Sequence, residues 1–388
     1  MAIYLDNSAT TALCGQARQA MIEAMDRYGN PSSKHQLGLD AERMVEAARA
    51  QVASALGVRP GVGQIYFTAS GTEANNLAIL GSVYAKERRT GKCIVTTEGE
   101  HSSVEAVMQK LERDGFEVIR IPTKNGVLDM EFAARVIDKG TLLVSAMMVN
   151  NETGALYDLK SLFALAKRNN PSVVTHCDAV QGFMKAIFSP AAIGADLLTV
   201  SSHKIHGPKG VGALYVSAEI LKAKKLIPVT LGGGQEGGMR SGTENVIGIA
   251  GFGAAAAAAQ SSLRADLAHM TRLRTYLEGG LAQIEGITLN LPVGTRAPHV
   301  VNLTLPDIKS ETMLNYLSAK DIYVSSGSAC SSHGHATSRA LAAFGLTAER
   351  ADCALRISLC PSNTEADADA LCRALADGVR TLVRIHRS

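Results

Sequence analysis

Apolar runs and helical segments alternate along the first two thirds of the chain. Short apolar runs bounded by turn-forming or charged residues are typical of buried strands, and they occupy residues 64–68, 92–97, 117–121, 142–149, 173–177, 197–201 and 211–216. Helical segments separate several of these runs, at residues 72–86 and from about residue 102. Because strands that alternate with helices form βαβ units, this part predicts an α/β fold with a doubly wound, mostly parallel sheet.

The last third of the chain follows a different pattern. An Ala-rich segment at residues 246–278 predicts a long helix, because Ala has the highest helix propensity. Shorter strands are expected at residues 287–291, 300–305, 322–325 and 354–358, and helices at residues 310–319 and 365–385. A strand at residues 3–5 fits either part. We predict a large domain over residues 12–255 and a smaller α+β domain formed by residues 1–11 and 256–388.

Composition and charge limit the possible partners and location. The chain has 388 residues, is 46% hydrophobic and carries a formal net charge of only +3, so we expect no nucleic-acid partner. No apolar run reaches the length of a membrane span, and the acidic Asp6 comes too early for a signal peptide. Seven cysteines without framework spacing favour free thiols in a reducing cytoplasm.

A lysine and an aspartate each follow a predicted strand. Lys204 lies just after residues 197–201, and Asp178 ends the run at residues 173–177. Ligands of open α/β sheets bind at the carboxyl ends of the strands. Pyridoxal 5'-phosphate (PLP) needs a lysine for its Schiff base and an acidic partner for its pyridinium nitrogen. The pair therefore predicts a PLP site, the alternative being a solvated loop lysine.

Further polar residues follow the predicted strands and fit the same cofactor. Gly71 and Thr72 open a helix, where free N–H groups favour a phosphate, and Ser201 and His203 add donors. The alternative is an ordinary capped helix start. His101 is a candidate to stack on a flat ring or to move protons, and Asn151 and Gln181 are candidates to bond the ring's phenolic oxygen; these positions also fit structural roles.

Two residues of the last third are candidates for the reaction itself. Cys330 stands among Ser and Gly residues, which suits an accessible nucleophilic thiol. A metal site with His333 and His335 and an inert cysteine are the alternatives, but no second ligand pair is evident. Arg356 alternates with apolar neighbours on a predicted strand, where it would clamp a substrate carboxylate or reach the surface.

The chain resembles the cysteine desulfurases of the NifS/IscS type, which are fold type I PLP enzymes of the class V aminotransferase family. The resemblance extends over nearly the whole chain and is carried by Tyr4-Leu5-Asp6-Asn7-Ser8-Ala9-Thr10-Thr11, Thr68-Ala69-Ser70-Gly71-Thr72-Glu73, Glu100-His101, Asp178-Ala179-Val180-Gln181, His203-Lys204, Met239-Arg240-Ser241-Gly242-Thr243-Glu244-Asn245 and Ser325-Ser326-Gly327-Ser328-Ala329-Cys330. One departure is Glu236-Gly237-Gly238, where many members carry Arg.

The resemblance implies a reaction and a set of roles. L-cysteine would be converted to L-alanine, with its sulfur passed to Cys330 as a persulfide for iron–sulfur cluster assembly or another thio-cofactor. Lys204 would hold PLP covalently, Asp178 would pair with its ring nitrogen, His101 would stack on the ring and Arg356 would bind the substrate carboxylate. Thr243 would reach the cofactor phosphate of a neighbouring subunit, which implies a homodimer. The sequence does not identify the sulfur acceptor, which could be an iron–sulfur scaffold or a thiolation relay. Two alternative functions are a different PLP-dependent lyase or aminotransferase reaction and a non-catalytic docking role.

Overall fold

The computed structural model describes residues 2–59, 63–85, 91–326 and 338–382. Its main feature is a seven-stranded sheet with the strand order β2-β8-β7-β6-β5-β3-β4. The strands are β2 (Gly63–Thr68), β3 (Cys93–Thr97), β4 (Glu117–Ile121), β5 (Thr141–Met147), β6 (Val174–Asp178), β7 (Leu197–Ser201) and β8 (Gly212–Ser217). Each predicted strand of the large sheet is present, within a few residues of its expected bounds.

All strands of this sheet are parallel except β8. The pairs β3–β4, β3–β5, β5–β6 and β6–β7 are parallel, whereas β8 runs antiparallel to both β7 and β2. The segment 202–211 that joins β7 to β8 is too short for a crossover helix, so the chain must turn back beside β7. The prediction of a mostly parallel α/β sheet is confirmed, with one reversed strand.

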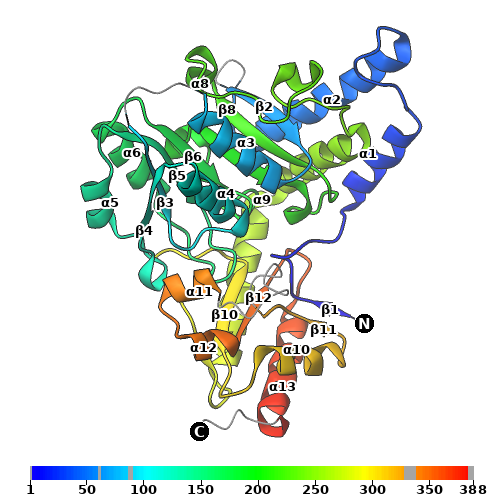
Figure 1. Cartoon of the computed structure of the whole chain (residues 1–388). Helices are drawn as coiled ribbons and strands as arrows, with labels where there is room; N and C mark the ends of the chain where they lie inside the picture. Colours follow the sequence, from blue (N-terminus) through cyan, green and yellow to red (C-terminus); the bar gives the residue numbers. More distant parts are fainter. Residues whose placement is uncertain (1, 60–62, 86–90, 327–337, 383–388) are drawn as a thin grey trace.

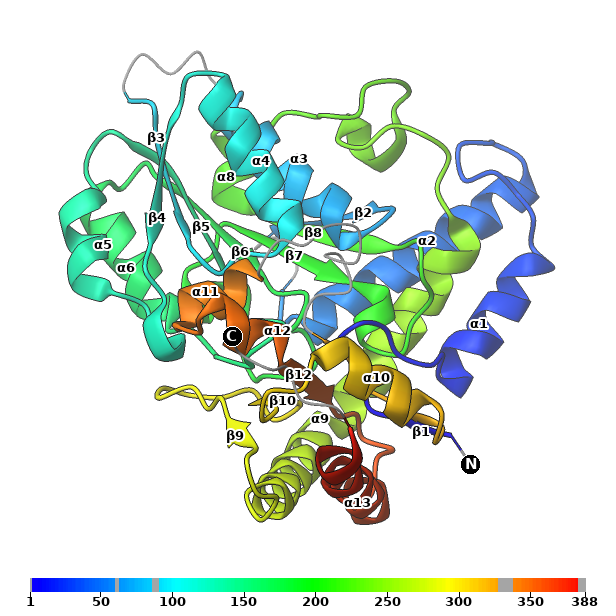
Figure 2. The same ribbon diagram turned by 60° about the horizontal axis from the view of Figure 1, so that its bottom comes forward.

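Helices cover both faces of the sheet (Figures 1 and 2). Successive side chains of a strand point to opposite faces: Ile94 and Leu197 pack with helices α3 (Gly71–Val83) and α4 (Ser102–Arg113). Val95 and Leu198 pack on the other face, in a core that also contains residues of α2, α5, α6 and α9. Because the strands are apolar on both sides, the sheet is buried between two helical layers.

A second, smaller core is built around strands from the last third of the chain. β10 (Val300–Thr304) pairs antiparallel with β12 (Ala354–Ser358) and β9 (Thr288–Leu289). The amino-terminal β1 (Ile3–Tyr4) pairs in parallel with β11 (Ile322–Tyr323). The first residues of the chain therefore lie with the last third, below the large sheet in Figure 1.

Helix α9 (Val246–Leu281) connects the two parts. Its first half contributes Ile249 and Phe252 to the large core, and its second half contributes Leu277 and Leu281 to the small one. It is the one described helix long and apolar enough to cross a membrane by composition, and it packs instead against α1, α2 and α13. The predicted boundary at residue 255 falls inside this helix, so the division into domains stays a prediction.

The remaining helices pack around the large sheet or belong to the smaller part of the chain. They are α1 (Gly15–Met25), α2 (Gln36–Ala55), α5 (Met130–Val136), α6 (Leu159–Asn169), α7 (Pro190–Ile193), α8 (Ala218–Lys222), α10 (Ser310–Ser318), α11 (Arg339–Phe344), α12 (Ala348–Asp352) and α13 (Glu365–Thr381), with short 3-10 turns at Lys124–Gly126, Ser202–Lys204 and Gln235–Gly238. The last helix ends at Thr381, before the predicted residue 385, because Leu382 is extended.

Candidate active site

A cavity of about 290 Å³ lies at the carboxyl ends of the parallel strands. This is the edge where open α/β sheets place their ligands. Its lining includes all but two of the residues predicted from the sequence, namely Gly71, Thr72, His101, Asn151, Asp178, Gln181, Ser201, His203, Lys204 and Arg356. Residues from both cores therefore meet in one site.

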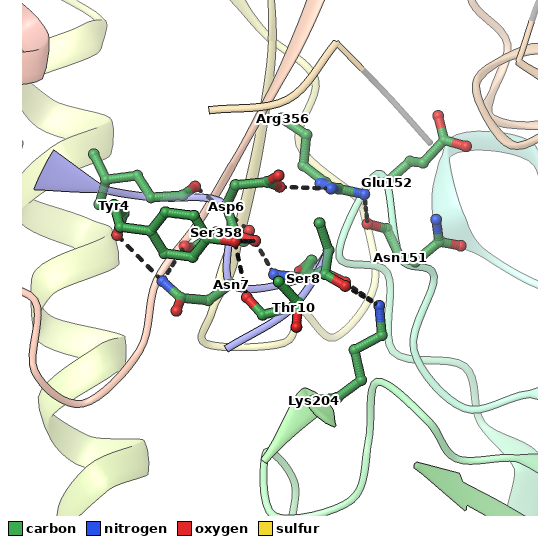
Figure 3. Close-up of polar contacts among 12 residues, drawn as sticks. Tyr4, Asp6, Asn7, Ser8, Thr10, Asn151, Glu152, Lys204, Arg356 and Ser358 are labelled. Atoms are coloured by element: carbon green, nitrogen blue, oxygen red, sulfur yellow. Dashed lines mark hydrogen bonds and ion pairs between the residues drawn. The ribbon is translucent and has the colours of Figure 1, made fainter. Parts of the chain in front are cut away.

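Lys204 ends the 3-10 turn that follows β7 and is half-buried. Its amine donates hydrogen bonds to the carbonyl oxygens of Ser8 and Ala9, at 2.6 and 2.7 Å (Figure 3). It is therefore held at the cavity by the amino-terminal segment, unlike a solvated loop lysine. Sequence reasoning gave the Ser8 and Ala9 carbonyls no role, because a backbone acceptor leaves no mark on residue type.

Asp178 ends β6 and is held by two donors. Its Oδ2 accepts a hydrogen bond from the Asn75 amide at 2.8 Å, and its Oδ1 accepts one from the Val180 backbone at 3.0 Å. The same Asn75 nitrogen lies 2.8 Å from the Ser103 hydroxyl. These bonds fix the direction of the carboxylate. Asn75 was missed, although it lies four residues after Gly71 and thus on the same face of the helix.

The amino terminus of α3 forms one end of the cavity. Ser70 caps the helix, as the structural alternative predicted, because its hydroxyl accepts a hydrogen bond from the Glu73 backbone at 3.1 Å. Gly71 has no room for a side chain: a Cβ there would lie 2.9 Å from Val180 Cγ2 and 3.4 Å from Ser201 Cβ. The buried Ser201 hydroxyl has no hydrogen-bond partner within the described ranges. Helix N–H groups beside this hydroxyl suit a phosphate.

Two histidines line the cavity. His203 Nδ1 lies 3.2 Å from the Thr10 hydroxyl, and burial together with the nearby Lys204 charge lowers the pKa of His203 to about 4. Its imidazole is therefore neutral near pH 7. His101 caps α4, and its Nδ1 accepts a hydrogen bond from the Ser103 backbone at 3.2 Å. This bond holds the His101 ring in place at the cavity.

Arg356, on β12, is only 2% exposed, so it is not a surface arginine. Its guanidinium donates to Asp6 Oδ1 at 2.8 Å and to the Asn151 carbonyl oxygen at 3.1 Å (Figure 3). Its Nε–H has no partner among the described residues. Asp6 was not assigned a role from the sequence, and it orients a guanidinium that lines the cavity and has donors for a carboxylate.

Gln181 is held from several sides. Its Nε2 donates to the Ser8 carbonyl oxygen at 2.9 Å, and its Oε1 accepts from Lys185 Nζ at 3.2 Å and lies 3.3 Å from His299 Nε2. Lys185 and His299 were also missed, because each is a single polar residue among mostly apolar neighbours. They orient an amide that lines the cavity.

Of the two remaining predicted residues, only Thr243 is among the described residues. Thr243 is exposed and does not line the cavity, so its contact with a second subunit stays a prediction. Cys330 lies outside the described residues. The described residues that flank this segment contact residues near the cavity. The Ser325 backbone pairs with that of Arg356, and the Ser338 hydroxyl donates a hydrogen bond to the Glu152 carboxylate at 2.6 Å.

The residues of the cavity fit PLP. The α3 amino terminus and the Ser201 hydroxyl, which has no partner among the described residues, suit its phosphate. The fixed Asp178 carboxylate suits a pyridinium nitrogen, and the Lys204 amine suits its aldehyde. These groups come from separate strands and meet only in the folded chain. Their roles toward the cofactor stay predictions.

Known proteins match this chain over nearly its whole length. The family model for class-V aminotransferases matches residues 3–371. "Cysteine desulfurase IscS" of Vibrio cholerae serotype O1 is 37% identical over 388 residues, which cover 98% of this chain and 94% of that protein. A solved NifS-like protein is 36% identical with a TM-score of 0.90 and covers 98% of this chain and 100% of its own. A structure of SspA in complex with cysteine is 28% identical, has a TM-score of 0.79 and covers 93% and 99% of the two chains.

These matches agree with the fold described above and extend over nearly the whole chain. The family model covers both the large sheet and the smaller core, and the solved NifS-like protein has the same α/β architecture. The chain belongs to the aminotransferase class-V family.

Proposed function

We propose that the protein is a PLP-dependent cysteine desulfurase that converts L-cysteine to L-alanine and transfers the sulfur to Cys330. The observation that carries this proposal is the meeting of Lys204, Asp178 and Arg356 in one cavity. A lysine and an acid suit the cofactor, and a buried arginine suits the carboxylate of an amino acid. The relatives named as cysteine desulfurases support the choice of substrate.

PLP, when bound, supplies an electron sink for reactions at the α-carbon of an amino acid. Asp178 stabilises a proton on the ring nitrogen, and the bonds from Asn75 and Val180 keep its carboxylate in place. Thr72, Ser201 and His203 would hold the phosphate beside Gly71. Asn151 and Gln181 would bond the ring, and His101 would stack on it. Lys204 anchors the cofactor and then moves the proton at the substrate's α-carbon.

Arg356 orients the substrate. Its guanidinium, fixed by Asp6 and the Asn151 carbonyl oxygen, binds the carboxylate of cysteine. The substrate carboxylate would then accept a hydrogen bond from the Arg356 Nε–H, which has no partner among the described residues. The side chain of cysteine would extend toward His101, which serves as acid or base for the sulfur steps.

Cys330 accepts the sulfur. Its thiolate attacks the substrate sulfur, so that an S–S bond forms and the Cβ–S bond breaks. The electron pair of the broken bond stays with the substrate carbon, which takes up a proton to become the methyl group of alanine. The enzyme keeps the sulfur as a persulfide for an acceptor protein, such as an iron–sulfur scaffold or a thiolation relay.

The central test is the Cys330→Ala variant. It should bind PLP with an unchanged visible absorption band but release no sulfide and form no persulfide from cysteine, because the sulfur has no acceptor. The matched control Cys372→Ala, on α13, should keep full activity. Full sulfide release by Cys330→Ala would overturn the assignment.

The assembly and location are parts of the same proposal. We propose a homodimer in which Thr243 of each subunit completes the phosphate site of the other, since Thr243 is exposed and outside its own cavity. SspA, solved in complex with cysteine, supports L-cysteine as the substrate. We also propose a cytoplasmic location, which would keep the Cys330 thiol reduced.

A further inference from the structure

Lys185 is a buried lysine beside the proposed cofactor cavity. It follows β6 and is only 7% exposed. No carboxylate lies within ion-pair distance of it in the part of the chain that the structure describes. A buried amine without an acidic partner is costly unless it is neutral and hydrogen-bonded. Such a residue calls for an explanation beyond packing.

The hydrogen bonds of Lys185 lead toward Lys204. Its Nζ donates to Gln181 Oε1 at 3.2 Å, and Gln181 Nε2 donates to the Ser8 carbonyl oxygen at 2.9 Å. That same oxygen accepts the Lys204 amine at 2.6 Å. Lys185 donates to the same Oε1 that lies 3.3 Å from His299 Nε2, and it thus favours the orientation in which the Gln181 nitrogen faces Ser8. The shared Ser8 oxygen couples this orientation to the position of Lys204.

The surroundings of Lys185 favour a neutral amine. Burial, followed by the positive charges of Lys204 and Arg356, lowers the pKa of Lys185 to about 7, and the Cys360 thiol acts in the opposite direction. Among the described residues, the charge of Lys185 also affects the titration of His203, His206 and His299. The pKa values of all three histidines are lowered, chiefly by burial, so they do not compensate a charge on Lys185.

A second cavity gives this amine a path for protons. This larger cavity, of about 1200 Å³, is lined by both Lys185 and Lys204, whereas only Lys204 also lines the cofactor cavity. Water in the larger cavity can therefore exchange protons with Lys185 without passing through the substrate site.

We propose that Lys185 is a positioning residue that holds the amide of Gln181 in one orientation and, through the Ser8 carbonyl, sets the place and charge environment of Lys204. The proposal deepens the proposed function, since it rests on PLP binding at Lys204. Lys185 itself is not among the described residues that line the cofactor cavity. Above neutral pH the Lys185 amine is an uncharged hydrogen-bond donor. Below neutral pH it adds a positive charge near Lys204.

The test compares Lys185→Met and Lys185→Arg in the cofactor-loaded enzyme. A positive charge nearby disfavours the protonated form of the Lys204 nitrogen. Lys185→Met should raise the pH midpoint of the cofactor's visible absorption band, and Lys185→Arg should lower it, each by about 0.5 unit or more. The kcat of Lys185→Met should fall about tenfold while KM for cysteine changes less than about twofold. Lys209→Met, an exposed lysine of the same larger cavity, is the matched control and should change neither value.

A double-mutant cycle separates positioning from general stability. If Lys185 acts through Gln181, adding Lys185→Met to Gln181→Ala should cost almost nothing further in kcat. Additive losses would overturn the proposal, as would an unchanged absorption midpoint in folded Lys185→Met. Should Lys185→Met not fold, Lys185→Arg decides the question by the sign of its shift. A missing absorption band in the unaltered enzyme would contradict the proposed function instead.

Discussion

At the scale of single residues, the site depends on buried groups whose charge the fold controls. Glu100 precedes His101 and is buried, and its Oε1 accepts hydrogen bonds from the Thr97 hydroxyl at 2.6 Å and the Met147 backbone at 2.8 Å. Burial, with a smaller effect of the Asp178 and Glu105 carboxylates, raises the pKa of Glu100 to about 8. The side chain is therefore protonated at neutral pH, which spares the site another negative charge near Asp178.

The raised pKa of Glu100 predicts a pH-dependent stability. An acid whose pKa is higher in the folded than in the unfolded chain stabilises the fold at low pH and loses this contribution as pH rises through its folded pKa. We expect the wild type to lose stability relative to Glu100→Gln between about pH 5 and 9, by on the order of 2–5 kcal/mol. Urea unfolding of both proteins at several pH values measures the difference. Parallel stability curves would show that Glu100 titrates normally in the fold.

At the scale of elements, two short segments have backbones that favour glycine. The first is the start of α3 with Gly71. The second is the turn Gln235–Gly238, in which Glu236 binds Arg49 of α2 at 2.7 Å and the Phe67 backbone of β2 at 2.9 Å. Gly237 and Gly238 have φ angles of 62° and 82°, where a side chain is disfavoured. Glycines therefore suit these two positions, and the Glu236 contacts hold the turn that precedes Thr243.

The tight start of α3 predicts a binding defect in Gly71→Ala. The added Cβ would lie 2.9 Å from the stiff Val180 side chain and 3.4 Å from Ser201 Cβ, so the phosphate end must widen. We expect PLP affinity, measured by equilibrium titration of apoenzyme, to fall about tenfold or more, equivalent to about 1.4 kcal/mol.

A second glycine supplies the control for Gly71→Ala. A Cβ on Gly279, in α9, meets nothing within 4 Å. Gly279→Ala should therefore leave PLP affinity unchanged and stabilise the fold by about 0.5–1 kcal/mol. Wild-type affinity in Gly71→Ala would show that the phosphate does not approach this helix.

At the scale of the whole molecule, the proposed site is shared between parts that lie far apart in the sequence. The first residues pair with the last third of the chain and at the same time supply the carbonyl oxygens that hold Lys204. Arg356 of the smaller core reaches Asn151 of the large one. Closure of the site therefore depends on the packing of both cores, with α9 passing through each (Figure 2).

The proposed dimer predicts complementation between inactive variants. Lys204→Ala and Thr243→Ala each disable every site of their own homodimer. In a hybrid dimer, the subunit with Lys204 intact receives an intact Thr243 from its partner, so one site is restored. Refolding an equal mixture should return about a quarter of the wild-type sites, because half of the dimers are hybrids with one good site each. Cysteine desulfurase activity of the mixture measures this, and activity no higher than that of the separate variants would contradict the shared site.

The sequence by itself determined the elements and the chemical types at the site. Apolar runs bounded by turn residues identified the strands, and the positions of Asp178 and Lys204 just after two of them indicated the cofactor edge. These features depend on neighbours within a few residues, so a local pattern is sufficient.

Only the tertiary structure decided strand order, the reversed β8, and the partners of the charged groups. The Ser8 carbonyl at Lys204 and Asp6 at Arg356 were not predicted, because each joins segments that burial brings together or uses a backbone atom common to all residues. Local periodicity carries no information about which distant segment fills the space beside a buried charge. The tertiary structure decides which segments meet, and each buried polar group then bonds the partner that packing brings within reach.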